Sequence, residues 1–167
     1  MIRFWQKRFS SDIKTKNLAI DKELATLKKE LKSEIAKKFA SSLAIRMVDS
    51  GSCNACEAEC NALSNPYYDL ERFGVHFVAS PRHADVLLVS GVVTLNMLPH
   101  LLDAYEQLPS PKWVITLGDC ALCHTLPDSF AIAGPVSAHL PVAHHIPGCP
   151  PAPDAIIAGL LAFLRKL

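Results

Sequence analysis

The chain of 167 residues is long enough for one domain with a substantial core, and its composition, 50% hydrophobic and 20% charged, excludes an intrinsically disordered protein. The net charge of +1 hides an asymmetry, because residues 1–46 carry twelve Lys and Arg against five Asp and Glu, whereas the remainder carries five against eleven. A basic extension on a mildly acidic domain indicates a partner subunit, an anionic membrane surface or nucleic acid, and no base-reading motif supports nucleic acid.

Residues 1–42 are predicted to form a basic, amphipathic extension in front of the domain formed by residues 43–167. Within residues 18–39, apolar side chains recur every three or four positions and Lys and Glu fill the other face, which predicts an amphipathic helix. This helix either packs on its own domain or docks on another subunit. The start of the chain is too polar for a secretory signal peptide, and no segment is long and apolar enough to predict a membrane span.

The rest of the chain alternates between short β-branched runs and longer amphipathic segments. The runs predict strands over residues 43–48, 75–79, 86–90, 113–117 and 142–146. The segments between them predict helices over residues 56–73, 95–107 and 153–166. This alternation is typical of βαβ units, so the predicted fold class is α/β, a mostly parallel, buried sheet with flanking helices.

Four cysteines directly follow predicted strands. Cys53 and Cys56 follow the first strand, Cys120 the fourth and Cys149 the fifth. Because loops at the carboxyl ends of parallel strands converge on one edge of an open sheet, we expect the four thiols to lie together. A glycine shortly before each site lets the backbone approach a bulky inorganic group. Six cysteines without a secretory signal favour metal or redox chemistry, and four thiolates would complete a 4Fe–4S site.

Zinc is the main alternative, because four thiolates also bind zinc tetrahedrally. Cys120 and Cys123 form a second Cys-x-x-Cys pair, and a zinc site of Cys53, Cys56, Cys120 and Cys123 would leave Cys149 without a role. The spacing favours iron–sulfur over zinc and keeps a zinc-stabilised binding module as an alternative. A thioredoxin-like dithiol is weaker, since it leaves the other converging cysteines unexplained.

Three motifs occur in order along the predicted core: CNACEAE, TLGDCA and HIPGCPPAPDAI. Together they resemble the small subunits of nickel–iron hydrogenases and the 20-kDa subunit of respiratory complex I, over residues 46–167. The resemblance implies a flavodoxin-like fold and one 4Fe–4S cluster beside a large catalytic subunit. Carried over to this sequence, the iron ligands would be Cys53, Cys56, Cys120 and Cys149.

The spacing of the first two cysteines discriminates within that family. Complex I subunits carry adjacent cysteines, whereas Cys53 and Cys56 are separated by two residues, a spacing that resembles the hydrogenase branch. The short chain, without a further cluster domain, resembles the membrane-bound, energy-converting group, which includes formate hydrogenlyase and carbon-monoxide-linked hydrogenases.

This resemblance implies an electron-transfer small subunit that is not catalytic alone. Its partners would be a ferredoxin-like iron–sulfur subunit, membrane subunits of the complex, and a large subunit holding a nickel–iron centre. Its place would be peripheral, on the cytoplasmic side of the inner membrane. A 20-kDa-type subunit of complex I or a related complex is the alternative.

For several residues near the cysteines, the sequence allows more than one role. Glu59 matches a glutamate of the family motif, which implies a place at the large-subunit interface or in proton movement. Glu57 is interpreted as a first-turn glutamate stabilised by the helix dipole, and Asp119 either tunes the cluster or forms a turn. The remaining candidates are interpreted as packed or locally hydrogen-bonded side chains: Cys60, Cys123, His124, His144 and His145.

Overall fold

The computed structural model describes residues 21–122 and 129–167, and its centre is a five-stranded parallel sheet. The strands are β1 (Leu43–Asp49), β2 (Val75–Phe77), β3 (Val86–Ser90), β5 (Trp113–Leu117) and β7 (Val142–Ile146). All five predicted strands are confirmed; β1 is one residue longer than predicted and β2 two residues shorter. The runs are strands because the sheet is covered on both faces, and every residue of β3 is buried.

The strands lie in the order β2-β1-β3-β5-β7, which is the flavodoxin-like order. The direction of winding reverses between β1 and β3, where Val48 pairs with Val89 and Asp49 with Ser90. The carboxyl ends of all five strands therefore point to one edge of the sheet. The predicted flavodoxin-like fold is confirmed.

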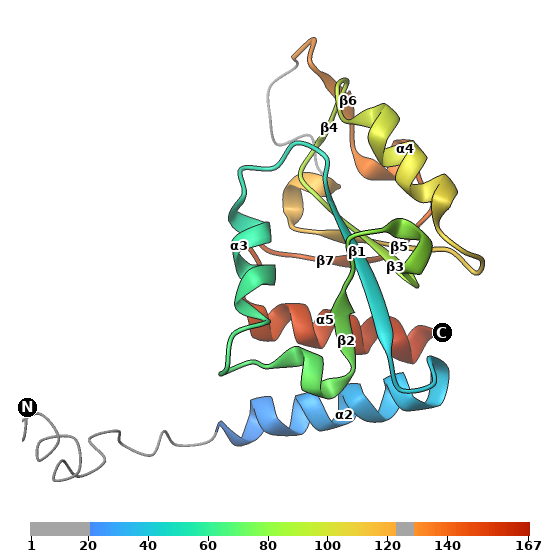
Figure 1. Cartoon of the computed structure of the whole chain (residues 1–167). Helices are drawn as coiled ribbons and strands as arrows, with labels where there is room; N and C mark the ends of the chain where they lie inside the picture. The colour runs from blue at the N-terminus through green and yellow to red at the C-terminus, as the bar shows by residue number, and fades with distance from the viewer. Residues whose placement is uncertain (1–20, 123–128) are drawn as a thin grey trace, which may run out of the picture.

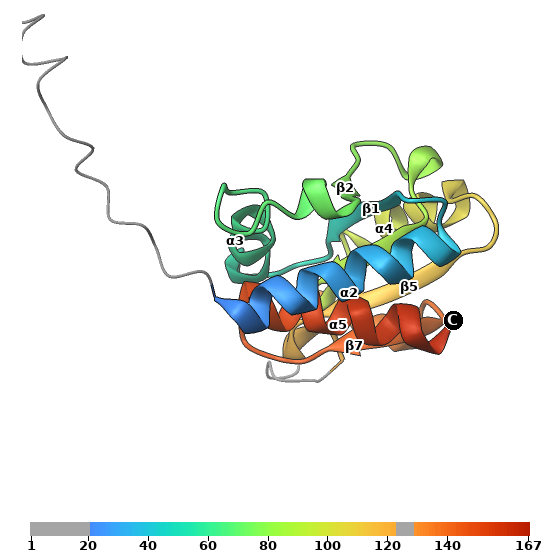
Figure 2. The same cartoon turned by 90° about the horizontal axis from the view of Figure 1, so that it is seen from below.

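Helices form a layer on each face of the sheet. On one face, α2 (Lys22–Lys38) and α5 (Pro153–Lys166) lie side by side, and α3 (Ala55–Ala62) stands near the start of α5 (Figures 1 and 2). On the other face lies α4 (Leu98–Gln107), whose Leu101 is fully buried. Each layer closes its own hydrophobic core against the sheet.

The predicted amphipathic helix is present as α2 and packs on its own domain. The Asp21 carboxylate accepts hydrogen bonds from the backbone N–H groups of Glu23 (3.0 Å) and Leu24 (3.2 Å), which caps the helix. Leu31 and Ile35 are fully buried in the core shared with α5. The predicted residues 18–20, and the aromatic and basic residues before them, lie outside the described residues.

The single helix predicted over residues 56–73 is wrong. α3 ends at Ala62, and a 3₁₀ turn covers Leu70–Phe73. Between them Asn65 Oδ1 accepts hydrogen bonds from the backbone N–H groups of Tyr67 (2.8 Å) and Tyr68 (3.0 Å). This Asn-centred turn, followed directly by Pro66, competes with the helix and ends it.

Two shorter features also differ from the prediction. β4 (Val93–Thr94) and β6 (Ile132–Gly134) form a small antiparallel sheet whose short runs carry no periodic signal. α4 begins at Leu98 rather than at residue 95, since Pro99 occupies its first turn. The other 3₁₀ turns are Pro81–His83, Asp119–Ala121 and Val136–Ala138. Within the described residues, no helix has the length and apolar character needed to cross a membrane.

Candidate functional site

The first loop of the site joins β1 to α3 and carries Cys53 and Cys56. Asp49, the last residue of β1, accepts hydrogen bonds through Oδ1 from the backbone N–H groups of Gly51 (2.8 Å) and Ser52 (2.6 Å). Cys56 lies in the first turn of α3, and Cys53 lies in the loop before it. Cys53 is exposed and Cys56 is partly buried. The carboxylate of Asp49 therefore sets the path of the backbone into the two cysteines.

Glu57 ties this loop to the neighbouring strand. Its Oε2 accepts a hydrogen bond from Ser52 Oγ at 2.8 Å, and its Oε1 accepts one from Ser90 Oγ at the end of β3. Hydrogen bonds to a carboxylate are stronger than those between neutral groups. The helix-dipole interpretation of Glu57 did not include this bridge, because it joins residues 33 positions apart in the sequence.

Asp119 joins the loops that carry Cys120 and Cys149. Its Oδ1 accepts a hydrogen bond from the backbone N–H of Gly148 at 2.8 Å. Its own backbone N–H donates to the Gly148 carbonyl oxygen at 2.9 Å. This reciprocal pair holds the two loops together, which gives Asp119 a structural role between them.

Gly118 brings the first loop against these two. Its φ is +83°, and a Cβ built at this position would lie only 2.6 Å from Cys56 Sγ. In Figure 1, α3 also stands beside the start of α5, which directly follows the loop of Cys149. The structure therefore brings the loops of Cys53 and Cys56, Cys120 and Cys149 to the carboxyl edge of the sheet.

The four thiols are close enough to influence one another's ionisation. Burial first, and then the negative charges of Glu57, Cys53, Cys120 and Cys149, raise the pKa of Cys56 to about 11. The charge of Cys120 first, and then burial and a hydrogen bond to Cys120, raise the pKa of Cys149 above its usual value. A bound metal would relieve this repulsion, since it displaces the thiol protons and supplies positive charge.

Four thiols are a donor set of the kind that iron–sulfur clusters use. Four thiols arrive on three loops, and the lack of a side chain at Gly118 allows Cys56 Sγ to lie directly against it. Within residues 21–122 and 129–167, no three His, Cys, Asp or Glu side chains lie close enough to hold one metal ion. Cys123, which the zinc alternative requires, lies outside the described residues.

Two further candidates lie on α3. Glu59 is half-buried, one turn along the helix from the site. Cys60 is 2% exposed, and burial, followed by the charge of Cys56, raises its pKa to about 12. The interpretation of Cys60 as a small buried side chain agrees with this position.

The histidines that the structure describes near the site have local contacts. His145 Nδ1 lies 3.0 Å from the hydroxyl oxygen of Thr116 on β5. His144 Nδ1 lies 3.3 Å from Lys166 Nζ at the end of α5. Both contacts agree with histidines hydrogen-bonded beside the sheet. His124 lies outside the described residues.

The sequence is similar to those of known proteins. The family model described as NADH ubiquinone oxidoreductase, 20 Kd subunit, matches residues 53–163. A probable membrane-bound hydrogenase subunit of Pyrococcus furiosus is 47% identical over 121 residues, 72% of each chain. An NADH-quinone oxidoreductase subunit of Citrifermentans bemidjiense is 43% identical over 112 residues, 67% of this chain and 66% of that protein. The chain therefore spans about two thirds of the length of such relatives.

A solved structure agrees with the sequence relatives. A chain in the structure of the membrane-bound sulfane sulfur reductase, an archaeal respiratory membrane complex, superposes with a TM-score of 0.67 at 32% identity. The superposition covers 82% of this chain and 75% of that one. The likeness therefore extends over most of the chain.

Proposed function

The chain belongs to the family of the 20-kDa subunit of NADH ubiquinone oxidoreductase, and on that premise we propose that it is the electron-transfer small subunit of a membrane-bound, energy-converting nickel–iron hydrogenase. It carries no catalytic centre of its own. Electrons pass through it between ferredoxin-like subunits and a large subunit that holds the nickel–iron centre, where protons are reduced or hydrogen is oxidised. Its relatives include a probable membrane-bound hydrogenase subunit and an NADH-quinone oxidoreductase subunit.

The observation that carries the proposal is the meeting of three cysteine loops at one edge of the sheet. Cys53, Cys56, Cys120 and Cys149 would each bind one iron of a 4Fe–4S cluster, which stores and releases a single electron. The contact between Gly118 and Cys56 Sγ and the reciprocal bonds between Asp119 and Gly148 support this assignment.

The chain's own residues hold the ligands in place and leave one side open. Asp119 clamps the loops of Cys120 and Cys149, and Glu57 anchors the loop of Cys53. Cys53 and Cys149 are exposed, so the large subunit would cover this edge. Glu59, half-buried on α3, would stand near that interface and serve proton movement or docking.

We also propose a position in the cell for this chain. The complex would include membrane subunits, and this chain would sit peripherally on the cytoplasmic side of the inner membrane. Its basic extension, residues 1–42, would contact those subunits or the anionic lipid surface.

Metal analysis with low-temperature EPR on the anaerobically purified complex tests this proposal. We expect about four irons per chain and a cubane-type signal after dithionite reduction, with nickel in the copurifying large subunit. Replacement of Cys149 by Ser should abolish the signal. About one zinc per chain without an EPR signal would instead indicate the zinc-stabilised module and would overturn the electron-transfer proposal.

A second candidate is a related complex whose large subunit has no nickel. Its support is the 32% identity to a chain of the membrane-bound sulfane sulfur reductase and the 43% identity to an NADH-quinone oxidoreductase subunit. The Cys-x-x-Cys spacing favours the hydrogenase over a complex I subunit. Iron and the EPR signal without nickel in the purified complex would decide for the second candidate.

A further inference from the structure

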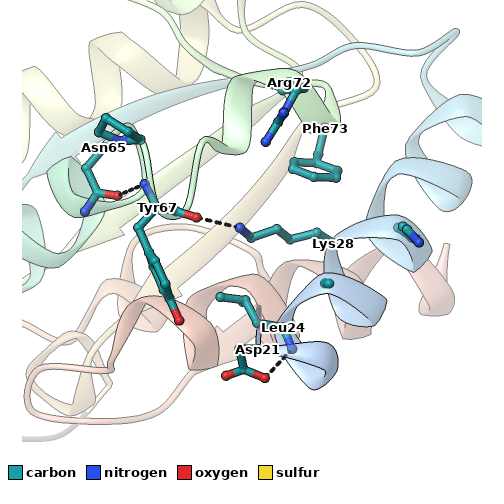
Figure 3. Close-up of a pocket in the computed structure, with 10 residues that line it drawn as sticks. Asp21, Leu24, Lys28, Asn65, Tyr67, Arg72 and Phe73 are labelled. Carbon is teal, nitrogen blue, oxygen red and sulfur yellow. Dashed lines mark hydrogen bonds between the residues drawn. The ribbon is translucent and has the colours of Figure 1, made fainter. Parts of the chain in front are cut away.

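A cavity of about 750 Å³ opens between the start of α2 and the segment 65–73 (Figure 3), and its described lining contains no cysteine. Its walls combine apolar groups with three cationic side chains. The residues that matter here are Leu24, Lys28, Lys29, Tyr67, Arg72 and Phe73. The cavity depends on a contact between elements far apart in sequence, and the proposed electron transfer does not use it.

Lys28 is the unusual residue of this cavity, because its charged side chain is only 7% exposed. Its ammonium donates a hydrogen bond to the carbonyl oxygen of Tyr67 at 2.9 Å. The ammonium also lies 5.8 Å from the ring centroids of Tyr67 and Tyr68 and 5.5 Å from that of Phe73. The aromatic faces partly offset the cost of burying the charge.

Two of the three N–H donors of the Lys28 ammonium have no acceptor among the described residues. A lysine carries three N–H donors, and among the described residues only the Tyr67 carbonyl oxygen accepts one of them. Figure 3 shows the Lys28 side chain extending into the space between Tyr67 and Phe73. A ligand in the cavity can therefore receive two hydrogen bonds from a nearly buried cation.

The surrounding charges also favour an anion. Lys29 and Arg72 line the cavity together with Lys28, and Asp21 is the one carboxylate among the described lining residues. The Asp21 carboxylate caps α2, and Asp69 nearby is paired with Arg72 Nε at 2.9 Å. The carboxylates are therefore engaged, and the cavity has an excess of positive charge beside apolar walls.

We propose that this cavity binds the phosphate headgroup of an anionic phospholipid. The phosphate receives hydrogen bonds from Lys28 and lies near the charges of Lys29 and Arg72, while the glycerol and first methylene groups contact Leu24 and Phe73. This site does not depend on the metal centre, so that either proposal can fail without the other.

Residues 1–20 of the chain itself are a less suitable ligand for this cavity than an anionic phospholipid. They carry five Lys and Arg against one Asp, so their charge has the same sign as the cavity. They join α2 at Asp21, on the lining of the cavity. A basic segment and a cationic cavity at the same end of the helix would both be drawn to an anionic membrane surface.

Calorimetric titration of the full chain with dioctanoyl phosphatidylglycerol, below its micelle concentration, tests the proposal. A soluble lipid is used because intact anionic vesicles would also attract the basic residues 1–20. We expect saturable binding, at least tenfold tighter than that of dioctanoyl phosphatidylcholine. Lys28→Met, which keeps the apolar stem, should weaken binding about tenfold. Lys29→Gln at an exposed position should weaken it about threefold.

Lys38→Met, which removes an exposed lysine from the far end of α2, is the matched control and should bind like the original chain. If the Lys28→Met variant does not fold, the lipid binding of Lys29→Gln alone tests the proposal. Equal binding of both lipids, or unchanged binding by the folded cavity variants, would overturn the proposal. The proposal would also be overturned if inorganic phosphate bound as tightly as the lipid. The same holds if the lipid bound only after residues 1–20 were removed.

Discussion

Gly118 lies directly against the sulfur of Cys56, so that a Cβ at position 118 would stand 2.6 Å from Cys56 Sγ. The φ of Gly118 is +83°, which also disfavours any side chain. Gly118→Ala should therefore displace Cys56 and cost about 1–3 kcal/mol of backbone strain. We expect the iron content of the purified complex to fall at least fivefold while the chain stays folded. Iron and sulfide analysis beside thermal unfolding measures both effects.

Gly74→Ala is the control for backbone strain alone. Gly74 has a φ of +92°, and its added Cβ would lie 2.7 Å from the carbonyl oxygen of Ser41, at the opposite end of the sheet. This variant should lose comparable stability and keep its iron. If both variants retained full iron content, the contact between Gly118 and Cys56 would not constrain the site.

Glu57 should contribute more to stability than Glu59, although both lie on α3. The Glu57 carboxylate bridges the hydroxyl groups of Ser52 and Ser90. Glu57→Ala removes two hydrogen bonds to a charged group and should lower the free energy of unfolding by about 2 kcal/mol. Glu59→Ala should change it by less than about 0.5 kcal/mol. Urea unfolding of the two variants measures the difference.

Glu59 should affect activity rather than stability. If Glu59 serves proton movement or docking, Glu59→Gln should lower the hydrogen turnover of the intact complex severalfold without loss of iron. Full turnover by Glu59→Gln would remove that role.

Two variants of Asp119 should distinguish its role in positioning the loops from the effect of its negative charge. Asp119→Asn keeps an oxygen that can accept the hydrogen bond from the Gly148 N–H, which lies 2.8 Å from Oδ1. Cluster content should therefore persist, and loss of a negative charge should raise the midpoint potential by roughly 20–60 mV. Asp119→Ala also removes the clamp and should lower the iron content. EPR-monitored redox titration distinguishes the variants; an unchanged potential in Asp119→Asn would exclude an electrostatic role.

The sequence predicted the sheet well because its central strands, β3 and β5, are buried on both faces. Apolar runs rich in β-branched residues, such as residues 86–90, favour a buried strand. The order of the strands then places Cys53, Cys120 and Cys149 at one edge of the sheet. The turn at Asn65 was missed because apolar residues continue past it, and side-chain hydrogen bonds within the turn outweigh that periodicity.

The bridge from Glu57 to Ser90 and the cavity around Lys28 were not predictable. Each joins residues 33 or more positions apart, Glu57 to Ser90 and Lys28 to Tyr67, through side chains whose meeting depends on the finished packing. Local pattern determines which face of a helix is buried, but it does not say which loop that face will meet.

His144 should make the stability of the chain depend on pH in a predictable direction. Burial first, and then the neighbouring charges of Lys166 and His145, lower the pKa of His144, against a hydrogen bond with the Gly159 backbone that raises it. Because the folded pKa lies below the unfolded one, the unfolded chain binds more protons as the pH falls through about 6.5. The free energy of unfolding should therefore decrease from pH 7.5 to pH 5.5. His144→Gln should show a smaller decrease in urea unfolding, whereas His100→Gln, at an exposed position, should follow the original chain. An equal decrease in all three chains would show that His144 does not carry the effect.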